Sequence, residues 1–309
     1  MLSRTAESLF WMARYIERAE ATARLVEMGR RMAMLPGAYG QEEWRSVVAA
    51  AGAGAAFYPG ERIGEAEVCR SLILEENNPS SIRACLDRAR NNARAVRTAL
   101  TAEMWEGLND GWRWLGGVEA DTIQRDLPAT LERIRSLSAL FRGAAQTTML
   151  RGERYDFLSA GAFIERADMT LRLLDVKYFV LLPETGLVLD SRDRYRWISL
   201  LQATSAVRAF HYVYRGDFSP SKIAHFMILN RDFPCSLAFC YSGLRAALGR
   251  LADRYGARHD CHATVEKAVG QLRDREMDDI FDEGLHEFLL EAIHLNGRLS
   301  GELSRAYHF

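Results

Sequence analysis

Apolar residues near the start of the chain recur every three or four positions, which is the spacing of one face of an amphipathic helix. This pattern predicts a long helix from Leu2 to about Met34, ended by Pro36-Gly37. Because strand-like alternation is rare, we predict an all-α fold, a long antiparallel helical bundle. The same reasoning predicts further helices over about 78–105, 121–146, 155–183, 192–214, 234–255, 261–275 and 279–306.

Local signals suggest where some of these helices begin and end. Asn78-Pro79 is predicted to start a helix, because an asparagine side chain accepts bonds from free backbone N–H groups and proline suits the first turn. Pro234 is predicted to start the corresponding helix later in the chain. The run Asn109-Asp110-Gly111 is predicted to interrupt the helical pattern. The loop that follows would then expose apolar candidates for docking to a partner, namely Trp112, Trp114 and Leu115.

One segment of the first predicted helix recurs later in the sequence. Residues 15–20, which read Tyr-Ile-Glu-Arg-Ala-Glu, return 148 positions later as residues 163–168, Phe-Ile-Glu-Arg-Ala-Asp. A second match, at an offset of 155, relates residues 78–82 to residues 233–237. Repeats at a nearly fixed spacing indicate an internal duplication. We therefore predict two pseudo-equivalent halves that pack as one helical domain, with residues 1–150 in the first and 151–309 in the second.

Charge and hydropathy exclude several classes of partner. The 309 residues include 40 Lys and Arg against 41 Asp and Glu, a net charge of −1, whereas proteins that bind nucleic acid normally carry a basic excess. Charged residues interrupt every apolar stretch before it reaches the roughly 18 residues that a membrane span requires. The charged N-terminal segment does not resemble a signal peptide. We expect a cytoplasmic protein with no nucleic-acid or membrane partner.

The sequence contains no motif for a nucleotide, a metal or a catalytic nucleophile. It has no phosphate-binding loop, no nucleophile elbow and no H-E-x-x-H helix. Its five cysteines form no C-x-x-C pair and are most simply reduced, buried side chains. Glu291 and His294 have the Glu-x-x-His spacing of di-iron bundles, but a second copy is missing. We therefore predict no metal site and no cofactor.

The repeated Glu-Arg pairs are the strongest candidates for chemistry. Glu17 and Glu165 each follow a residue of the apolar stripe, so each carboxylate is expected at the edge of the buried face. Packing about a pseudo-twofold axis would allow Glu17 to meet Arg166 and Glu165 to meet Arg18. A buried ion pair needs good geometry to offset its desolvation. Two interpretations follow: the pairs fix helix register, or they form a central pocket with glutamates as acid or base and arginines as clamp.

Further arginines extend the binding interpretation to neighbouring helices. Arg14, Arg88 and Arg90 join Arg18 and Arg166 as candidate binding residues, because a guanidinium suits forked recognition of carboxylate or phosphate. The alternative is that most of these arginines lie on solvated faces, beside Asp and Glu residues one turn away.

Several segments together resemble one family, the alpha-E proteins of bacteria, which are named for their helices and a Glu-Arg pair. They are LFWMARYIERAEATARLVE, NNPSSIRACLDRARNNARAVR, MLRGERYDFLSAGAFIERAD and FMILNRDFPCSLAFCYSGL, which cover the chain in the expected order. The resemblance implies an association with a circularly permuted ATP-grasp ligase and a transglutaminase-like cysteine peptidase in peptide-modification systems. Where the family commonly has Pro-Arg-Ser, this chain has Pro234-Cys235-Ser236, so no arginine role is carried over there.

Three hypotheses about function follow. The first is a helical accessory module that docks to an ATP-grasp amide ligase or presents substrate to it. The second is an enzyme in which Glu17 and Glu165 act on a carboxylate- or amide-containing substrate. The third is a homo-oligomeric structural protein.

Overall fold

The computed structural model describes residues 2–34, 40–54, 57, 63–181 and 191–309. These residues form helices and connecting turns without any strand, which confirms the all-α prediction. Pro36-Gly37 and Pro183, which were expected to end two long helices, lie outside the described residues. The first half contains α1 (Ser3–Ala33), α2 (Gly40–Ala50), α3 (Glu65–Cys69), α4 (Ile82–Ala95), α5 (Ala102–Gly116), α6 (Ala120–Arg125) and α7 (Leu127–Thr148).

The second half of the chain has a similar series of helices. They are α8 (Glu153–Leu181), α9 (Ser191–Ala203), α10 (Val207–Tyr214), α11 (Pro220–Ile228), α12 (Leu237–Tyr255), α13 (Asp260–Arg273), α14 (Met277–Glu283) and α15 (Leu285–Ala306). A π-helical turn at Arg70–Leu74 follows α3, and a 3-10 turn at Arg97–Ala99 precedes α5. None of the described helices is long and apolar enough to cross a membrane.

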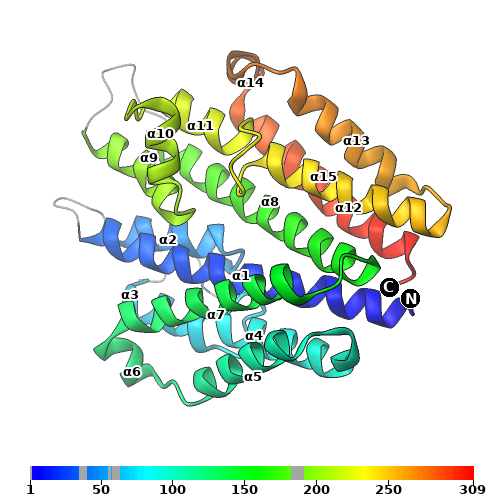
Figure 1. Ribbon diagram of the computed structural model, residues 1–309. Coiled ribbons are helices and arrows are strands. Elements are labelled where there is room, and N and C mark those ends of the chain that lie inside the picture. Colours follow the sequence, from blue (N-terminus) through cyan, green and yellow to red (C-terminus); the bar gives the residue numbers. More distant parts are fainter. Residues whose placement is uncertain (1, 35–39, 55–56, 58–62, 182–190) are drawn as a thin grey trace.

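The two long helices α1 and α8 pack against each other at the centre of the molecule (Figure 1). They run parallel, because Phe10 lies beside Gly161 whereas Glu17, further along α1, bonds to Arg166 further along α8. The flanking helices α4 and α7 run antiparallel to α1, and α12 and α15 run antiparallel to α8. The bundle is therefore an antiparallel one built on a parallel central pair.

Helix contacts in the first half have counterparts in the second. α1 packs on α4 and α7, and α8 packs correspondingly on α12 and α15. The outer helices also correspond, since α5 packs on α4 and α7 while α13 packs on α12 and α15. Such matched contacts are what an internal duplication produces. The duplication itself, and the division at residue 150, stay predictions.

The helices predicted to start at Asn78-Pro79 and at Pro234 begin about three residues later in the structure, as α4 and α12. The side chains of Ser81 and Ser236 cap these helices, accepting bonds at 3.1 Å from the backbone N–H of Ala84 and Phe239 respectively. Asn78 instead closes a turn, where its side-chain oxygen accepts from the Ser80 N–H at 3.0 Å. A serine directly before the apolar run is therefore a better start signal here than the preceding proline.

The predicted break at Asn109-Asp110-Gly111 is wrong, because these residues lie inside α5. Gly111 faces α7, and a Cβ atom at that position would lie 2.8 Å from the Leu137 side chain. The glycine therefore permits close packing of α5 on α7 rather than ending a helix. The docking loop expected here is absent as well, since Leu115 is buried at 2% exposure and the Trp112 indole N–H donates to Asp87.

Four other predicted helices are each divided in two. One of them, the predicted helix 279–306, is split between α14 and α15 at Gly284, which has φ of 101°. The predicted helix 78–105 ends at Ala95, and α5 starts at Ala102. The predicted helix 121–146 is split at Asp126, whose side chain caps α7. The predicted helix 192–214 is split between α9 and α10, where Ser205 adopts a left-handed backbone conformation with φ of 55°.

We predict that Gly161→Ala destabilises the protein by roughly 1–3 kcal/mol or more. A Cβ atom at Gly161 would lie 2.2 Å from the Phe10 carbonyl oxygen, so α1 and α8 would have to separate. The free energy of unfolding in urea measures the effect. Gly249→Ala is the matched control in α12, where a Cβ atom meets nothing within 4 Å. The control should gain up to about 1 kcal/mol from helix propensity, and equal effects of both variants would contradict this account.

Candidate functional site

The two Glu-Arg pairs of α1 and α8 bond to each other reciprocally. Arg166 donates to both oxygens of Glu17, with Nη2–Oε1 at 2.7 Å and Nε–Oε2 at 3.2 Å. Arg18 donates from Nε to Glu165 Oε1 at 2.5 Å. The predicted pairing of Glu17 with Arg166 and of Glu165 with Arg18 is confirmed. These bonds fix the register of the central helices, since sliding either helix by one residue would separate all four groups.

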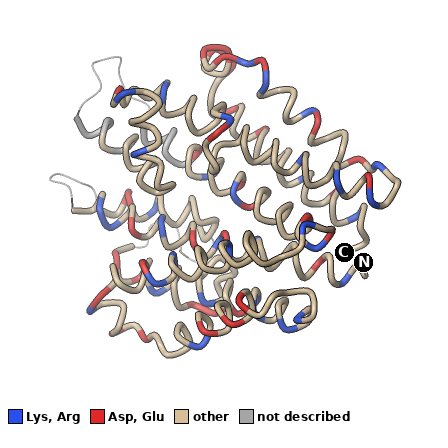
Figure 2. Tube along the Cα trace, in the orientation of Figure 1, with Lys and Arg blue, Asp and Glu red and all other residues tan. Residues whose placement is uncertain are grey.

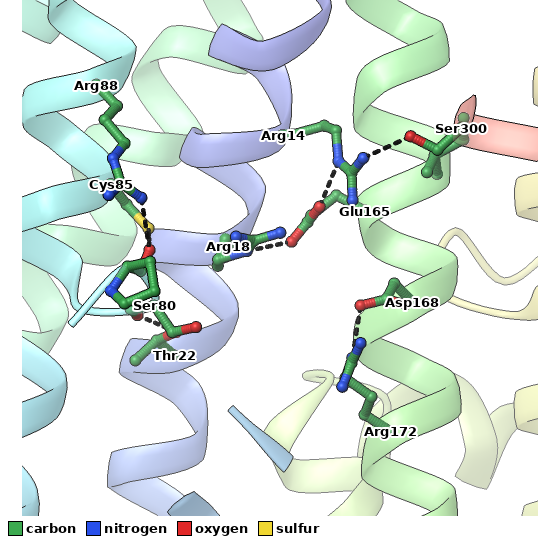
Figure 3. Close-up of polar contacts among 12 residues, drawn as sticks. Arg14, Arg18, Thr22, Ser80, Cys85, Arg88, Glu165, Asp168, Arg172 and Ser300 are labelled. Atoms are coloured by element: carbon green, nitrogen blue, oxygen red, sulfur yellow. Dashed lines mark hydrogen bonds and ion pairs between the residues drawn. The ribbon is translucent and has the colours of Figure 1, made fainter. Parts of the chain in front are cut away.

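A second arginine reaches each glutamate, and its origin differs between the two. Arg14, one turn before Arg18 on α1, donates from Nε to Glu165 Oε2 at 2.7 Å and from Nη1 to the Ser300 hydroxyl at 2.8 Å (Figure 3). The additional arginine near Glu17 is Arg142 of α7, whose Nη1 lies 3.6 Å from Glu17 Oε1. Arg142 also forms an ion pair with Glu20.

Glu165 is fully enclosed, and the two arginines beside it favour its charged form. Its side chain is 0% exposed. Burial alone would raise the pKa of this carboxyl group, but the charges of Arg14 and Arg18 outweigh burial, and the pKa lies below its usual range. A carboxylate held by two guanidinium groups is a poor proton acceptor near neutral pH. These contacts favour the register-fixing role for Glu165 over the acid or base role.

Glu17, by contrast, borders a pocket of about 220 Å³ at the junction of α1, α7, α8 and α9. We call it the arginine pocket. Its charged wall consists of Glu17, Glu20, Arg24, Arg142 and Arg166, and its apolar wall includes Leu25, Met169, Leu173 and Ala203. Three guanidinium groups and two carboxylates give the lining a net charge of +1. One carboxylate on a ligand would neutralise this excess.

Arg24 connects the charged wall to the turn between α9 and α10. Arg24 bonds to Glu20 Oε1 through Nε at 3.0 Å and through Nη2 at 2.5 Å, and it also donates to the Ser205 hydroxyl. Burial acts to raise the pKa of Glu20, but hydrogen bonds and charge from Arg142 and Arg24 hold it below its usual value of 4.5. Both carboxylates of the wall are thus already bonded to arginines, and the arginine side chains are more exposed than the glutamate side chains.

The structure separates the predicted binding residues into three groups. Arg166 lines the arginine pocket, whereas Arg14 and Arg18 bind Glu165. Arg88 donates to the Pro79 carbonyl at 3.3 Å, and Arg90 donates to Asn109 while its guanidinium lies 4.0 Å from the Trp112 ring centre. Neither Arg88 nor Arg90 lines the arginine pocket. Each instead links α4 to neighbouring structure.

Three members of the charged wall, Glu20, Arg24 and Arg142, were absent from the predicted site. The repeat held a signal for two of them, because Glu20 and Arg24 match Asp168 and Arg172 at the 148-residue offset. These second-half residues form the corresponding ion pair, with Arg172 Nε at 2.6 Å from Asp168 Oδ2. Arg142 had no such signal, because its place beside Glu17 depends on how α7 packs on α1.

Cysteines and metal ligands add little to this site. Cys69, Cys85, Cys240 and Cys261 are buried, as expected, whereas Cys235 is half-buried and lines the arginine pocket. Burial raises the pKa of the Cys235 thiol. Within the described part of the chain, no three His, Cys, Asp or Glu side chains gather in a way that could hold a metal ion.

Fold and site together define a class of all-helical proteins organised around buried Glu-Arg pairs. The chain belongs to the Alpha-E family, whose model matches residues 1–308 and is described as a predicted alpha-helical domain with a conserved ER motif. The Glu-Arg pairs of α1 and α8 have the residue order that this description names.

Similar proteins occur in mycobacteria. An uncharacterized protein of Mycobacterium bovis is 25% identical over 94% of this chain, and one from Mycobacterium tuberculosis is 24% identical over the same share. The chain spans only 35% of the length of either relative. No solved structure matches the chain.

We predict that Glu165→Gln lowers the free energy of unfolding by about 3–5 kcal/mol, because it leaves two buried arginines without their carboxylate. Glu266→Gln is the control, since Glu266 is about half exposed and lies 3.6 Å from the Arg245 guanidinium. An exposed pair of this kind contributes about 0–1 kcal/mol. Urea unfolding at neutral pH compares the variants, and a loss at Glu165 no larger than the control's would argue against the structural role.

Stability should fall in acid partly through Glu20. Because the pKa of Glu20 is lower in the folded state than its usual value of 4.5, the unfolded chain binds a proton first. The stabilisation is complete above about pH 4.5 and is lost as pH falls through the folded pKa. Urea unfolding between about pH 6 and pH 3 should therefore show a shallower decline for Glu20→Gln than for the unmodified protein. Parallel curves would contradict the assignment.

Proposed function

We propose that this protein is a helical accessory module of a bacterial amide-ligase system. In this proposal it binds a carboxylate-bearing substrate in the arginine pocket and presents it to a circularly permuted ATP-grasp ligase. A transglutaminase-like protein is the second proposed partner. Both partners follow from the family resemblance.

The arginine pocket is the observation that carries this proposal. Arg142 and Arg166 border the same cavity, and the lining has one positive charge in excess. A ligand carboxylate can bond to guanidinium groups in a forked, charge-assisted geometry. The apolar wall beside these arginines favours a ligand that carries a hydrocarbon group near its carboxylate. An amide ligase joins a carboxylate to an amine, so a protein that holds a carboxylate suits such a system.

Two observations support a module rather than a complete enzyme. The mycobacterial relatives are nearly three times as long as the segment that matches this chain, so the same unit occurs there within a larger protein. The sequence also contains no nucleotide-binding loop and no recognisable nucleophile motif. Activation of a carboxylate would then be the task of the partner ligase.

The rival hypothesis of an intrinsic enzyme now depends on Glu17 alone. Glu165 lines neither of the two pockets that border Glu17. Both oxygens of Glu17 already accept bonds from Arg166, and Arg142 lies near, so the carboxylate has bonding partners within the protein. A pair of catalytic glutamates acting on one substrate is therefore not favoured by this geometry.

Ligand binding can be measured through Cys235, the half-buried thiol of the pocket. We predict that N-acetyl-leucine slows alkylation of Cys235 by iodoacetamide at mildly alkaline pH, as followed by mass spectrometry. N-acetyl-leucinamide, which lacks the carboxylate, should protect much less. Arg142→Gln should abolish protection by N-acetyl-leucine, whereas Arg113→Gln, at an exposed position of α5, should not. Equal protection by acid and amide would overturn the carboxylate site.

The partnership is tested separately by purifying the tagged protein from its own host under native conditions. Recovery of an ATP-grasp ligase is expected, and the purified ligase should then hydrolyse ATP faster when this protein and its substrate are present. Isolation of the protein alone, together with an unchanged ligase rate after mixing, would reject the accessory role while leaving the binding site intact.

A further inference from the structure

A second pocket shares its charged residues with the arginine pocket. This cavity of about 350 Å³ is lined by residues of α1, α7, α8 and α12, and we call it the aromatic pocket. Glu17, Arg142 and Arg166 line both cavities. The remaining wall of the aromatic pocket is mainly apolar and includes Ile16, Phe141, Leu158, Ala162, Phe163 and Phe239.

The charged residues therefore stand between two apolar compartments. On one side are Leu25, Met169 and Leu173, and on the other are the apolar residues of the aromatic pocket, such as Phe141, Leu158 and Phe239. Cavities of about 150 Å³ already hold a small apolar molecule in other proteins, so each compartment is large enough for one apolar side chain. Arg142, from α7, and Arg166, from α8, reach Glu17 from different helices.

On the opposite side of the central pair, the equivalent space is filled by the protein itself. At the 148-residue offset, Leu158 and Ala162 of the aromatic pocket match Phe10 and Arg14. Arg14 occupies the space beside Glu165, and the Phe10 ring packs on Phe309 at a centroid distance of 5.4 Å. The smaller residues at 158 and 162 therefore leave open, beside Glu17, a space that Arg14 and Phe10 fill at the matching positions beside Glu165. The asymmetry favours an external occupant for the open side.

We infer that the two pockets are compartments of one groove that binds an extended peptide with the pattern apolar-x-acidic-x-apolar. The acidic side chain bonds to Arg142 and Arg166, and the two apolar side chains enter the compartments on either side. In an extended chain, residues two apart point the same way at a separation of roughly 7 Å. The inference rests on the proposed carboxylate site and adds to it the substrate class, a peptide.

Three matched probes test this inference on the 309-residue chain. The first is the capped pentapeptide acetyl-Leu-Ala-Glu-Ala-Leu-amide, the second has Gln in place of Glu, and the third is N-acetyl-leucine. Binding is measured by titration calorimetry and by protection of Cys235. The Glu pentapeptide should bind on the order of tenfold or more tighter than either other probe, because only it combines the carboxylate with both apolar contacts.

Two variants separate the compartments. Ala162→Phe fills the aromatic pocket and should weaken the Glu pentapeptide on the order of tenfold while leaving N-acetyl-leucine unaffected. Ala21→Phe fills the arginine pocket and should weaken both probes. Ser159→Phe is a second way to fill the aromatic pocket if Ala162→Phe does not fold, as judged by circular dichroism.

The outcomes distinguish this inference from the proposed function. If N-acetyl-leucine binds but the Glu pentapeptide is no tighter, or is insensitive to both aromatic-pocket variants, the groove is wrong and the carboxylate site stands. If the Gln pentapeptide binds as tightly as the Glu pentapeptide, the acidic position is wrong. If no probe carrying a carboxylate protects Cys235, the proposed function fails, and the groove fails with it.

Discussion

The burial of charge between α1 and α8 is the constraint on which the rest of the structure depends. Moving an unpaired carboxylate or guanidinium out of water costs several kcal/mol, so neither glutamate can be enclosed without its arginines. The reciprocal bonds from Arg166 to Glu17 and from Arg18 to Glu165 meet this requirement in only one register of the two helices. Gly161 allows the backbones to approach closely enough for that register. Flanking helices then cover the remaining apolar faces of the central pair and, through Ser300 and Arg142, complete its polar contacts.

Away from this centre, both signs of charge are interspersed along the chain (Figure 2).

The sequence was most informative where one local pattern decides the outcome. Apolar residues at helical spacing predicted the helices, and the repeated Glu-Arg pairs predicted which charged groups would meet across the centre. It was least informative where a residue's meaning depends on a distant helix. Gly111 read as a break because glycine weakens an isolated helix, yet its role is to admit Leu137 of α7. Arg90 was predicted to be a binding residue. In the structure its guanidinium packs on the Trp112 ring and donates a hydrogen bond to Asn109, both of α5.

The same limit explains how much of the candidate site was predictable. Glu17, Arg18, Glu165 and Arg166 stood out because they occur twice. Arg142 occurs once, on a helix with an ordinary mixture of charges, and only the packing of α7 on α1 brings it to Glu20. Small residues were equally uninformative. The space beside Ala162 becomes notable only when it is compared with the matching space in the other half, which Arg14 fills. An open cavity can be recognised only when the packing of the helices around it is known.

The parallel direction of α1 and α8 has a consequence for how the chain is made. Two parallel helices cannot be joined by a short turn, and here the bonds across the centre link residues 147 to 151 positions apart. During synthesis, α1 therefore emerges long before the helix that neutralises its buried charges. Contacts between such distant residues form slowly, because the intervening chain must first be ordered. Until α8 is made, the face of α1 that packs on α8 in the folded protein lacks its partner, and an apolar face of this kind is what chaperones shield.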